Sequence, residues 1–220
     1  MLHSFDGSLS TLRLGAILAG GRSRRFGSPK ALADLGGTLM VERVAAAVRG
    51  AGAHAVLISG PGVPDMRHLL PCREDGRPGL GPLGGLETAL EWARELGLGG
   101  ALCVACDTPF LAPGLLRALA ERGELGRGHI VAPESGGPLG VEPLCAWYPV
   151  GALPEIRDRL DRGCLALAAL LEAIPVDRIS LDEVRAHGDP GMIFLNVNTP
   201  ADRDRAAEIS ARAPRPETDG

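Results

Sequence analysis

The most informative part of this sequence is Leu14-Gly-Ala-Ile-Leu18-Ala-Gly-Gly-Arg-Ser-Arg-Arg-Phe-Gly-Ser-Pro-Lys30. It opens with an apolar run that is typical of a buried strand. Gly20 and Gly21 then let the backbone turn with its amides bare and pointing one way, which suits an anion. Arg25 and Lys30 are among the positive charges that follow. The stretch therefore predicts a phosphate-binding loop at the end of the first strand.

The best-known phosphate-binding motifs do not fit this loop. A P-loop requires Gly-Lys-Ser/Thr, whereas Gly27 is followed by Ser28-Pro29-Lys30, and the dinucleotide fingerprint also fails. An ordinary surface turn with solvated arginines is the alternative. Lys30 weighs against it, because it is the only lysine in the chain and supplies a compact point charge that arginine does not.

Composition limits the class of protein. A chain of 220 residues, 45% of them hydrophobic, fits one α/β domain over 13–211, between a flexible leader at 1–12 and a disordered tail at 212–220. No apolar run reaches the roughly 20 residues of a membrane span. The net charge of −4 and the single basic cluster argue against a nucleic-acid surface. Five cysteines without regular spacing indicate reduced thiols in the cytoplasm.

Strands and helices alternate along the first half of the chain. Apolar runs predict strands near 13–18, 55–58, 69–72 and 101–106, and helical spacing predicts helices near 39–49, 86–96 and 113–122. Further strands are expected near 130–132, 142–147, 176–179 and 193–197, and further helices near 153–161, 165–173 and from Thr199 onward. The alternation predicts a Rossmann-like, three-layer α/β/α fold with a mostly parallel central sheet.

Two aspartates follow predicted strands, at the edge where parallel sheets bind ligands. Asp107, fixed by the proline two residues on, suits Mg²⁺, which prefers one or two protein oxygens plus phosphate oxygens. A turn-forming aspartate is the alternative. Asp75 is expected to hold the nucleotide or a metal-bound water, with Glu74 as its competitor and a plain loop acid as the alternative.

Two further segments carry polar groups to ligands. Gly81-Pro-Leu-Gly-Gly-Leu86 is expected to place free amides at a helix N-terminus, where an anion or a base edge binds, although an ordinary helix-start turn has the same pattern. Asn196 and Asn198 are the only asparagines, and on a strand they would face the same side. Asn198 is placed to cap the final helix, so Asn196 is the better ligand candidate.

Cys103 and Cys106 form a Cys-x-x-Cys pattern, which invites a zinc or redox interpretation. Residues three apart on a strand point to opposite faces, so we do not expect them to chelate one ion. The five histidines form no metal-binding pair and are interpreted as structural or surface groups.

Together, these motifs resemble the molybdenum cofactor guanylyltransferase family. The resemblance is carried by the stretch from Leu18 to Lys30, by Gly81-Pro-Leu-Gly-Gly85 and by Cys106-Asp-Thr-Pro109, and it spans about residues 13–209. Glu142-Pro-Leu-Cys-Ala-Trp-Tyr148 and Asn196-Val-Asn-Thr-Pro200 strengthen it. Three features depart from the family pattern: Phe26 replaces the usual methionine, the gap before Lys30 is short, and Ser59 stands where asparagine is common, which bears on the choice of base.

The resemblance implies transfer of GMP from GTP to the terminal phosphate of molybdopterin, with release of pyrophosphate and with Mg²⁺ as cofactor. It implies nucleotide binding by Leu18, Ala19, Gly20, Gly21, Lys30, Asp75 and Asp107, metal binding by Asp107, and acceptor binding by Asn196 and Asn198. Lys30, Asp107 and Arg25 would be catalytic, because an anionic phosphate needs no general base and the barrier to its attack is charge. Partners would be other proteins of molybdenum cofactor biosynthesis or the acceptor molybdoenzymes, not nucleic acid or a membrane.

Three alternatives remain at this point. A related transferase would use CTP or act on a sugar or polyol phosphate. A nucleotide-binding module without catalysis would keep the loop and lose turnover, although the presence of Lys30 and Asp107 speaks against it. A redox protein built on the cysteine pair is the most distant of the three.

Overall fold

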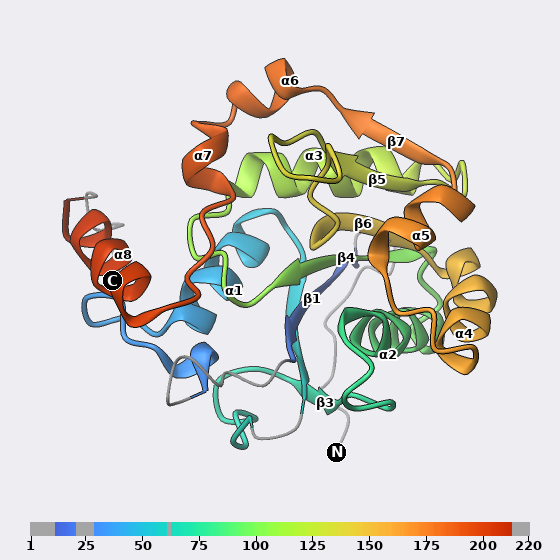
Figure 1. The fold of residues 1–220 in the computed structure, drawn as a ribbon, viewed down its shortest axis with the longest axis horizontal. Coiled ribbons are helices and arrows are strands. Elements are labelled where there is room, and N and C mark those ends of the chain that lie inside the picture. Colours follow the sequence, from blue (N-terminus) through green and yellow to red (C-terminus); the bar gives the residue numbers. More distant parts are fainter. Residues whose placement is uncertain (1–11, 21–28, 61–62, 213–220) are drawn as a thin grey trace.

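A seven-stranded sheet in the order β3-β2-β1-β4-β6-β5-β7 forms the centre of the computed structural model, which describes residues 12–20, 29–60 and 63–212 (Figure 1). The strands are β1 (Leu14–Ala19), β2 (His54–Ser59), β3 (Cys72–Glu74), β4 (Gly100–Ala105), β5 (Ile130–Pro133), β6 (Cys145–Pro149) and β7 (Val176–Ile179). Among these strands, β6 alone runs antiparallel to its neighbours, β4 and β5. The predicted mostly parallel α/β sheet is confirmed.

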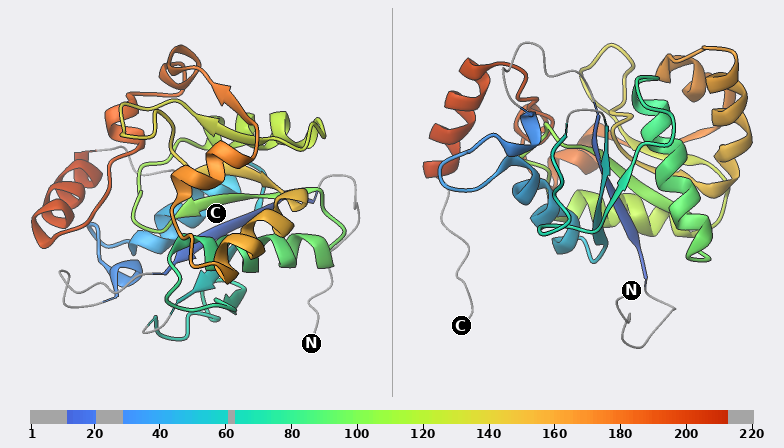
Figure 2. Two further views of the ribbon diagram at one scale, coloured as in Figure 1. Left: turned by 45° about the vertical axis from the view of Figure 1, so that its right-hand side comes forward. Right: turned by 90° about the horizontal axis from the view of Figure 1, so that it is seen from below.

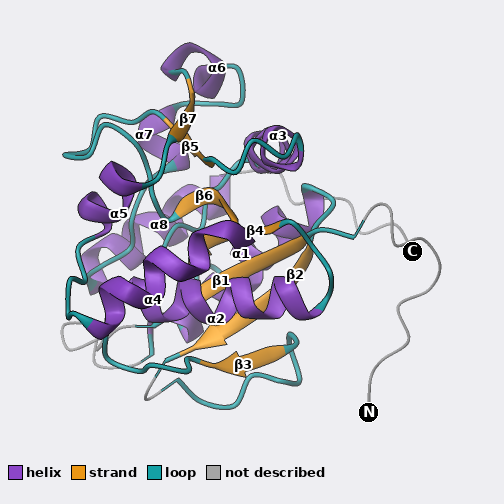
Figure 3. Ribbon diagram, turned by 90° about the vertical axis from the view of Figure 1, so that its right-hand side faces the viewer, coloured by secondary structure: helices purple, strands orange, loops and turns teal. Residues whose placement is uncertain are grey.

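Helices cover both faces of the sheet because the side chains of each strand alternate in direction. In β1, Leu14, Ala16 and Leu18 face α2 (Pro82–Glu95) and share one apolar core with α4 (Leu153–Asp161) and α5 (Leu167–Ala173). Ile17 and Ala19 face the other way, toward α1 (Met40–Gly50) and α3 (Pro113–Glu124). Figure 3 looks onto the face that α2 and α4 cover, with β1 and β2 behind them. These are the three layers that the alternation predicts.

In the described part of the chain, four short helices and one longer helix complete the fold. The short ones are η2 (Lys30–Leu32), η3 (Val150–Ala152), α6 (Leu181–Arg185) and α7 (Pro190–Ile193), and the longer one is α8 (Pro200–Arg212). Figure 2 shows α8 in red beside the blue segment that follows η2. Val197 and Ala206 pack there on Leu35 and Met40 in a small separate core. This core brings the end of the chain back to the segment that carries Lys30. Within the residues described, no helix has the length and apolarity needed to cross a membrane.

The prediction of a strand near 193–197 is wrong. Ile193 ends α7, whose first turn is capped by the Asp189 carboxylate accepting from the amide of Gly191, and the chain then runs as a loop to Thr199. Ile193 and Val197 are buried because they anchor this loop to two different cores. Apolar residues in a short run therefore marked anchor points here, not a strand.

Three element boundaries also differ from the predictions. The helix predicted from Leu86 begins at Pro82, because Gly81 has a φ of 70° and Pro82 takes the first helical position, which suits proline. β3 lies at Cys72–Glu74 instead of 69–72. β6 begins at Cys145 instead of Glu142, since residues 141–144 turn the chain into the sheet.

Candidate functional site

The carboxyl ends of four strands lie next to one another. Ala19 of β1 pairs with Ser59 of β2, which pairs with Glu74 of β3, and Leu18 pairs with Ala105 at the end of β4. Residues that follow these strands therefore gather at one edge of the sheet, as the strand order predicts. Of the predicted site residues, Gly21 and Arg25 lie outside those that the structure describes.

Lys30, Asp107 and Asn198 meet at this edge. The Lys30 Nζ lies 3.2 Å from the Asp107 Oδ2 and donates to the Asn198 Oδ1. About a fifth of each side chain of the ion pair is exposed, 19% for Lys30 and 22% for Asp107. An ion pair with this much exposure stays accessible to a ligand and adds little to stability. The sequence placed Lys30 and Asp107 together, and the structure adds Asn198 to them.

The turn after β4 fixes the position of Asp107. The Thr108 hydroxyl donates to the Ala105 carbonyl at 3.0 Å, and the Cys106 amide donates to the Leu18 carbonyl at 3.2 Å. The Val197 amide donates to the Asp107 carbonyl at 2.9 Å, which ties the late loop to the same turn. Asp107 thus sits on a rigid turn between the ends of β1 and β4, and Asn198 arrives with the loop.

The alternative in which the Asn198 side chain caps the final helix is wrong. The Thr199 hydroxyl caps α8 by accepting from the Asp202 amide at 3.1 Å, and the Asp202 carboxylate accepts from the Thr199 amide at 2.8 Å. The side chain of Asn198 is turned to Lys30 instead. Asn196 is exposed, and its amide donates to the Phe194 carbonyl at 3.4 Å. The stronger of the two asparagine candidates is therefore Asn198.

Asp75 is held by its own turn after β3. Its Oδ1 accepts from the Arg77 amide at 2.9 Å, and its own amide donates to the Ser59 carbonyl at 2.9 Å. Burial raises the pKa of this carboxyl group, and the hydrogen bond from Arg77 opposes that rise. A cavity of about 400 Å³ lies beside it, with Ser59, Glu74 and Asp75 in its wall. Glu74 and Asp75, the two competing acids of the sequence analysis, therefore line the same cavity.

The glycines of the Gly81–Leu86 segment serve a close approach between helix and turn. A Cβ on Gly84 would lie 2.8 Å from the Asp75 Oδ1 and 2.8 Å from the Arg77 carbonyl oxygen. A Cβ on Gly85 would lie 3.3 Å from a methyl group of Leu18. The first turn of α2 thus packs on both the Asp75 turn and β1, and a larger residue at Gly84 would displace Asp75.

Glu142 was not among the predicted site residues. It lies just before β6, whose Cys145 pairs with Val104, so Glu142 is near the carboxyl end of β4. Burial raises the pKa of its carboxyl group, which is about half enclosed, and a hydrogen bond from Ser135 lowers it. In the sequence, Glu142 could have been noticed because it is a carboxylate directly before a proline and an apolar strand, near the edge where the other polar residues gather.

The two cysteines of the Cys-x-x-Cys pattern lie in the cores on opposite faces of the sheet, Cys103 on the α2 side and Cys106 on the α1 side. Burial and the neighbouring Asp107 raise the pKa of Cys106 to about 12, so its thiol is neutral. Within the part of the chain described, no cluster of three histidine, cysteine or acidic residues is placed to hold a metal by itself. The redox and zinc interpretations fail on this geometry.

Solved structures place this arrangement in a class of enzyme. The molybdopterin-guanine dinucleotide biosynthesis protein A from Archaeoglobus fulgidus superposes with a TM-score of 0.74 at 26% identity, covering 90% of this chain and 98% of that one. A cytidylyltransferase of 2-C-methyl-D-erythritol 4-phosphate from Thermus thermophilus shares the fold, with a TM-score of 0.64 at 20% identity, covering 90% and 99%. The chain has the fold of the α/β nucleotidyltransferases.

Sequence comparison narrows the class to a family. The model of the MobA-like NTP transferase domain matches residues 15–178. A probable molybdenum cofactor guanylyltransferase from Pelotomaculum thermopropionicum is 36% identical over 87% of this chain and 90% of its own length. A molybdenum cofactor guanylyltransferase from Rhodobacter capsulatus is 34% identical, covering 88% and 94%. The chain belongs to the MobA-like NTP transferase family, and the resemblance seen in its motifs is confirmed.

Proposed function

We propose that this protein transfers GMP from GTP to the terminal phosphate of molybdopterin and releases pyrophosphate. Membership of the family and the names of the relatives support the choice of substrates. The observation that carries the proposal is the ion pair of Lys30 with Asp107, 3.2 Å between Nζ and Oδ2, at the edge where β1 and β4 end. It puts one compact cation and one carboxylate where the glycine-rich stretch begins.

The proposed reaction balances without a general base. An oxygen of the acceptor phosphate forms a bond to the α-phosphorus of GTP, and the bond from that phosphorus to the bridging oxygen of pyrophosphate breaks. The attacking oxygen is already anionic near neutral pH, so no proton needs to be removed. The difficulty is the approach of one anion to another, which positive charge and backbone amides relieve.

We assign the nucleotide phosphates to the backbone of Leu18, Ala19, Gly20 and Gly21 and to Lys30. Lys30 would neutralise charge on the triphosphate as pyrophosphate departs, and Arg25 would add a second positive charge. Asn198 supports this role because its Oδ1 accepts from the Lys30 Nζ and so orients the amine. Asp75, beside the cavity that Ser59 also lines, would bind the nucleoside.

A divalent metal ion, which we propose to be Mg²⁺, fits the residues present. Mg²⁺ uses one or two protein carboxylates and fills its shell with phosphate oxygens and water, so a single partly exposed aspartate suffices. Asp107 would hold it, and the metal would supply charge stabilisation at the phosphates. A structure of Rv0371c from Mycobacterium tuberculosis, 23% identical with a TM-score of 0.62, contains manganese.

The acceptor would lie on the other side of Lys30, toward the late loop. We assign Asn198 and Asn196 to this side, because the Val197 amide ties that loop to Asp107. We also propose that residues 13–211 form one transferase domain that works in the cytoplasm. The five cysteines, all free thiols, support a reducing compartment. Other enzymes of molybdenum cofactor biosynthesis or acceptor molybdoenzymes would be its protein partners.

The test is incubation of the full chain with Mg²⁺, molybdopterin and each of the four nucleoside triphosphates in turn. We expect pyrophosphate and molybdopterin guanine dinucleotide with GTP alone. Turnover with CTP would assign the protein to a different base, a point on which Ser59 in the cavity wall bears. Binding of GTP without any turnover would support the non-catalytic module instead.

A further inference from the structure

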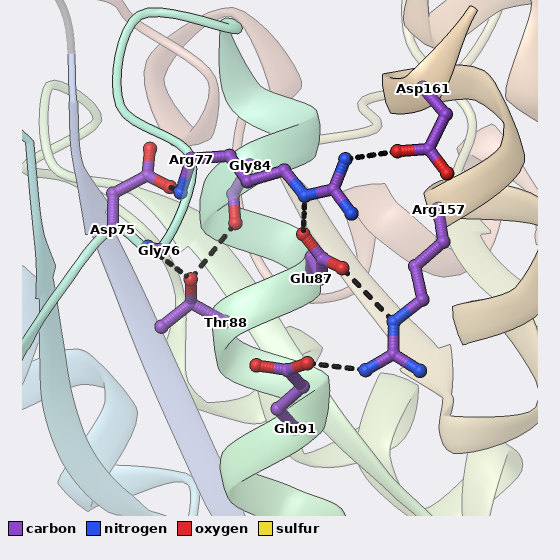
Figure 4. Close-up of polar contacts among 9 residues, drawn as sticks. All are labelled: Asp75, Gly76, Arg77, Gly84, Glu87, Thr88, Glu91, Arg157 and Asp161. Carbon is purple, nitrogen blue, oxygen red and sulfur yellow. Dashed lines mark hydrogen bonds and ion pairs between the residues drawn. The ribbon is translucent and has the colours of Figure 1, made fainter.

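The turn that carries Asp75 is clamped by side chains of α2. Besides the bond from the Arg77 amide to Asp75, the Gly76 amide donates to the Thr88 Oγ1 at 3.0 Å. The Thr88 hydroxyl in turn donates to the Gly84 carbonyl at 3.1 Å. Figure 4 shows this chain of bonds running from the turn onto the helix. Thr88 is 6% exposed, so water does not compete for these bonds.

Glu87, one residue earlier, holds the side chain of the same turn. Its Oε2 lies 3.0 Å from the Arg77 Nε, and its Oε1 accepts from the Arg157 Nε of α4 at 3.0 Å. Only 7% of the Glu87 side chain is exposed, against 34% for Arg77 and 36% for Arg157. Each carboxylate oxygen thus has its own arginine, and the most buried member of the cluster is the one that both arginines share (Figure 4).

The outer members of the cluster differ from Glu87 in what they touch. Asp161 pairs with Arg77 and Glu91 pairs with Arg157, and the side chains of Asp161 and Glu91 are 65% and 36% exposed, against 7% for Glu87. Glu91 has no bond to the turn, because its partner lies wholly on α4. Loss of Glu87 would leave two arginines without their shared buried partner, which costs far more than loss of an exposed pair. The cluster therefore depends on Glu87 and can spare Glu91.

We infer that Glu87 and Thr88 are positioning residues that fix the direction of the Asp75 carboxylate for the nucleoside. This inference rests on the proposed function, since it takes Asp75 as a nucleotide-binding group. Thr88 holds the backbone of the turn and Glu87 holds its Arg77 side chain, so Asp75 is fixed from both ends. Both residues are buried, so in this assignment they act through Asp75 and not on the nucleotide itself. The same bonds join α4, which packs on α2, to the nucleotide edge.

A purely structural role would make Glu87 a tie between α2 and α4 only. The two roles predict different effects of substituting Glu87. A tie between helices lowers stability and leaves the affinity of a folded enzyme unchanged, whereas a positioning residue changes nucleotide affinity through Asp75. In a double-mutant cycle, a residue that acts through Asp75 has no further effect once Asp75 is gone.

The experiment compares Glu87→Gln with its matched control Glu91→Gln in the full chain. Affinity is measured for α,β-methylene GTP with Mg²⁺, which blocks transfer, and amide hydrogen exchange is followed at Gly76 and Arg77 without nucleotide. We expect Glu87→Gln to raise the Kd about tenfold and to speed exchange at both amides about fivefold. Glu91→Gln stays within about twofold of the wild type. In an Asp75→Ala background, Glu87→Gln adds less than about twofold to the Kd.

Unchanged exchange at Gly76 and Arg77 in Glu87→Gln would overturn the inference, as would an equal loss of affinity with and without Asp75. If Glu87→Gln does not fold, Thr88→Val and Thr88→Ser make the same comparison, with Val expected to lose affinity and Ser to keep it. A wild-type chain that fails to bind the analogue would refute the proposed function instead. In that case the exchange rates alone decide whether Glu87 fixes the turn.

Discussion

The two aspartates at the carboxyl edge are held in opposite ways. Asp107 pairs with Lys30, which lies 77 residues away in the chain, and Lys30 in turn donates to Asn198, which is 168 residues from Lys30. Asp75 is held by its neighbours, with Arg77 two residues on and Gly76 bonded to Thr88 twelve residues on. The Asp107 cluster joins residues from both ends of the chain, whereas the Asp75 carboxylate accepts its bond from within its own turn, which β2 and α2 support. We expect the first to govern turnover and the second to govern affinity.

Asp107→Asn gives the largest expected effect. It keeps the size of the side chain and removes the charge that would hold the metal, so we expect kcat to fall by at least about a thousandfold. Turnover is measured as pyrophosphate release over a range of Mg²⁺ concentrations. The fold should persist, because the ion pair is partly exposed and contributes little to stability. Full turnover by this variant would remove the metal-binding role from Asp107 and with it the contrast with Asp75.

Lys30→Ala should follow, with a loss of about a hundredfold or more in kcat, which is typical for one group that stabilises charge in the transition state. The Michaelis constant for GTP should change less, because the backbone amides of the loop still bind the phosphates. Steady-state kinetics with varied GTP separates the two parameters. A variant that loses affinity and keeps kcat would make Lys30 a binding residue, like Asp75.

Much of the edge is predictable from sequence, because strand endings determine what meets at a parallel sheet. Lys30, Asp75 and Asp107 each follow a strand or its turn, and the register brings them to the same side. Asn198 was ranked below Asn196 because its place before the final helix suits a cap. The loop that carries it to Lys30 was not foreseen, because the apolar anchors Ile193 and Val197 imitate a strand.

Glu87 shows a second limit of sequence reasoning. Glu87 and Glu91 are four residues apart on α2 and share one polar stripe, which looks like a solvated face. Burial of Glu87 depends on α4, which is far along the chain and packs over α2. No local pattern tells the buried carboxylate from the exposed one. The same limit applies to Gly84. The glycine motif is visible in the sequence, but nothing in the sequence shows that Gly84 lies against Asp75.

Asn198→Ala tests whether the late loop belongs to the Asp107 cluster. It removes an acceptor from a charged donor, so we expect kcat to fall about tenfold through a misplaced Lys30. Thr199→Ala is the matched control. It changes the neighbouring residue and weakens the cap of α8, and it leaves the bond between Asn198 and Lys30 in place. The control should lose about 1 kcal/mol of stability and keep its kcat. Equal kinetic losses in both variants would mean that only the order of the loop matters.

The smallest effect concerns stability, and its sign follows from the raised pKa of Asp75. Burial raises the pKa of Asp75 in the folded protein above its ordinary value of 3.8, so ionising this group opposes folding. The cost is absent below the unfolded-state value, grows as pH rises through it, and is complete above the folded-state value. Asp75→Asn removes the cost and keeps an oxygen for the Arg77 amide. We therefore expect the variant to be more stable than the wild type at neutral pH.

Urea denaturation across the acid range checks this expectation. The advantage of Asp75→Asn should shrink as the pH falls toward about 4 and vanish where Asp75 is protonated in both states. The same variant should bind GTP about tenfold more weakly, since a nucleoside contact would lose its charge. Greater stability with weaker binding is the pattern of a group kept for function. A variant that is less stable at every pH would mean that Asp75 serves the fold of its turn.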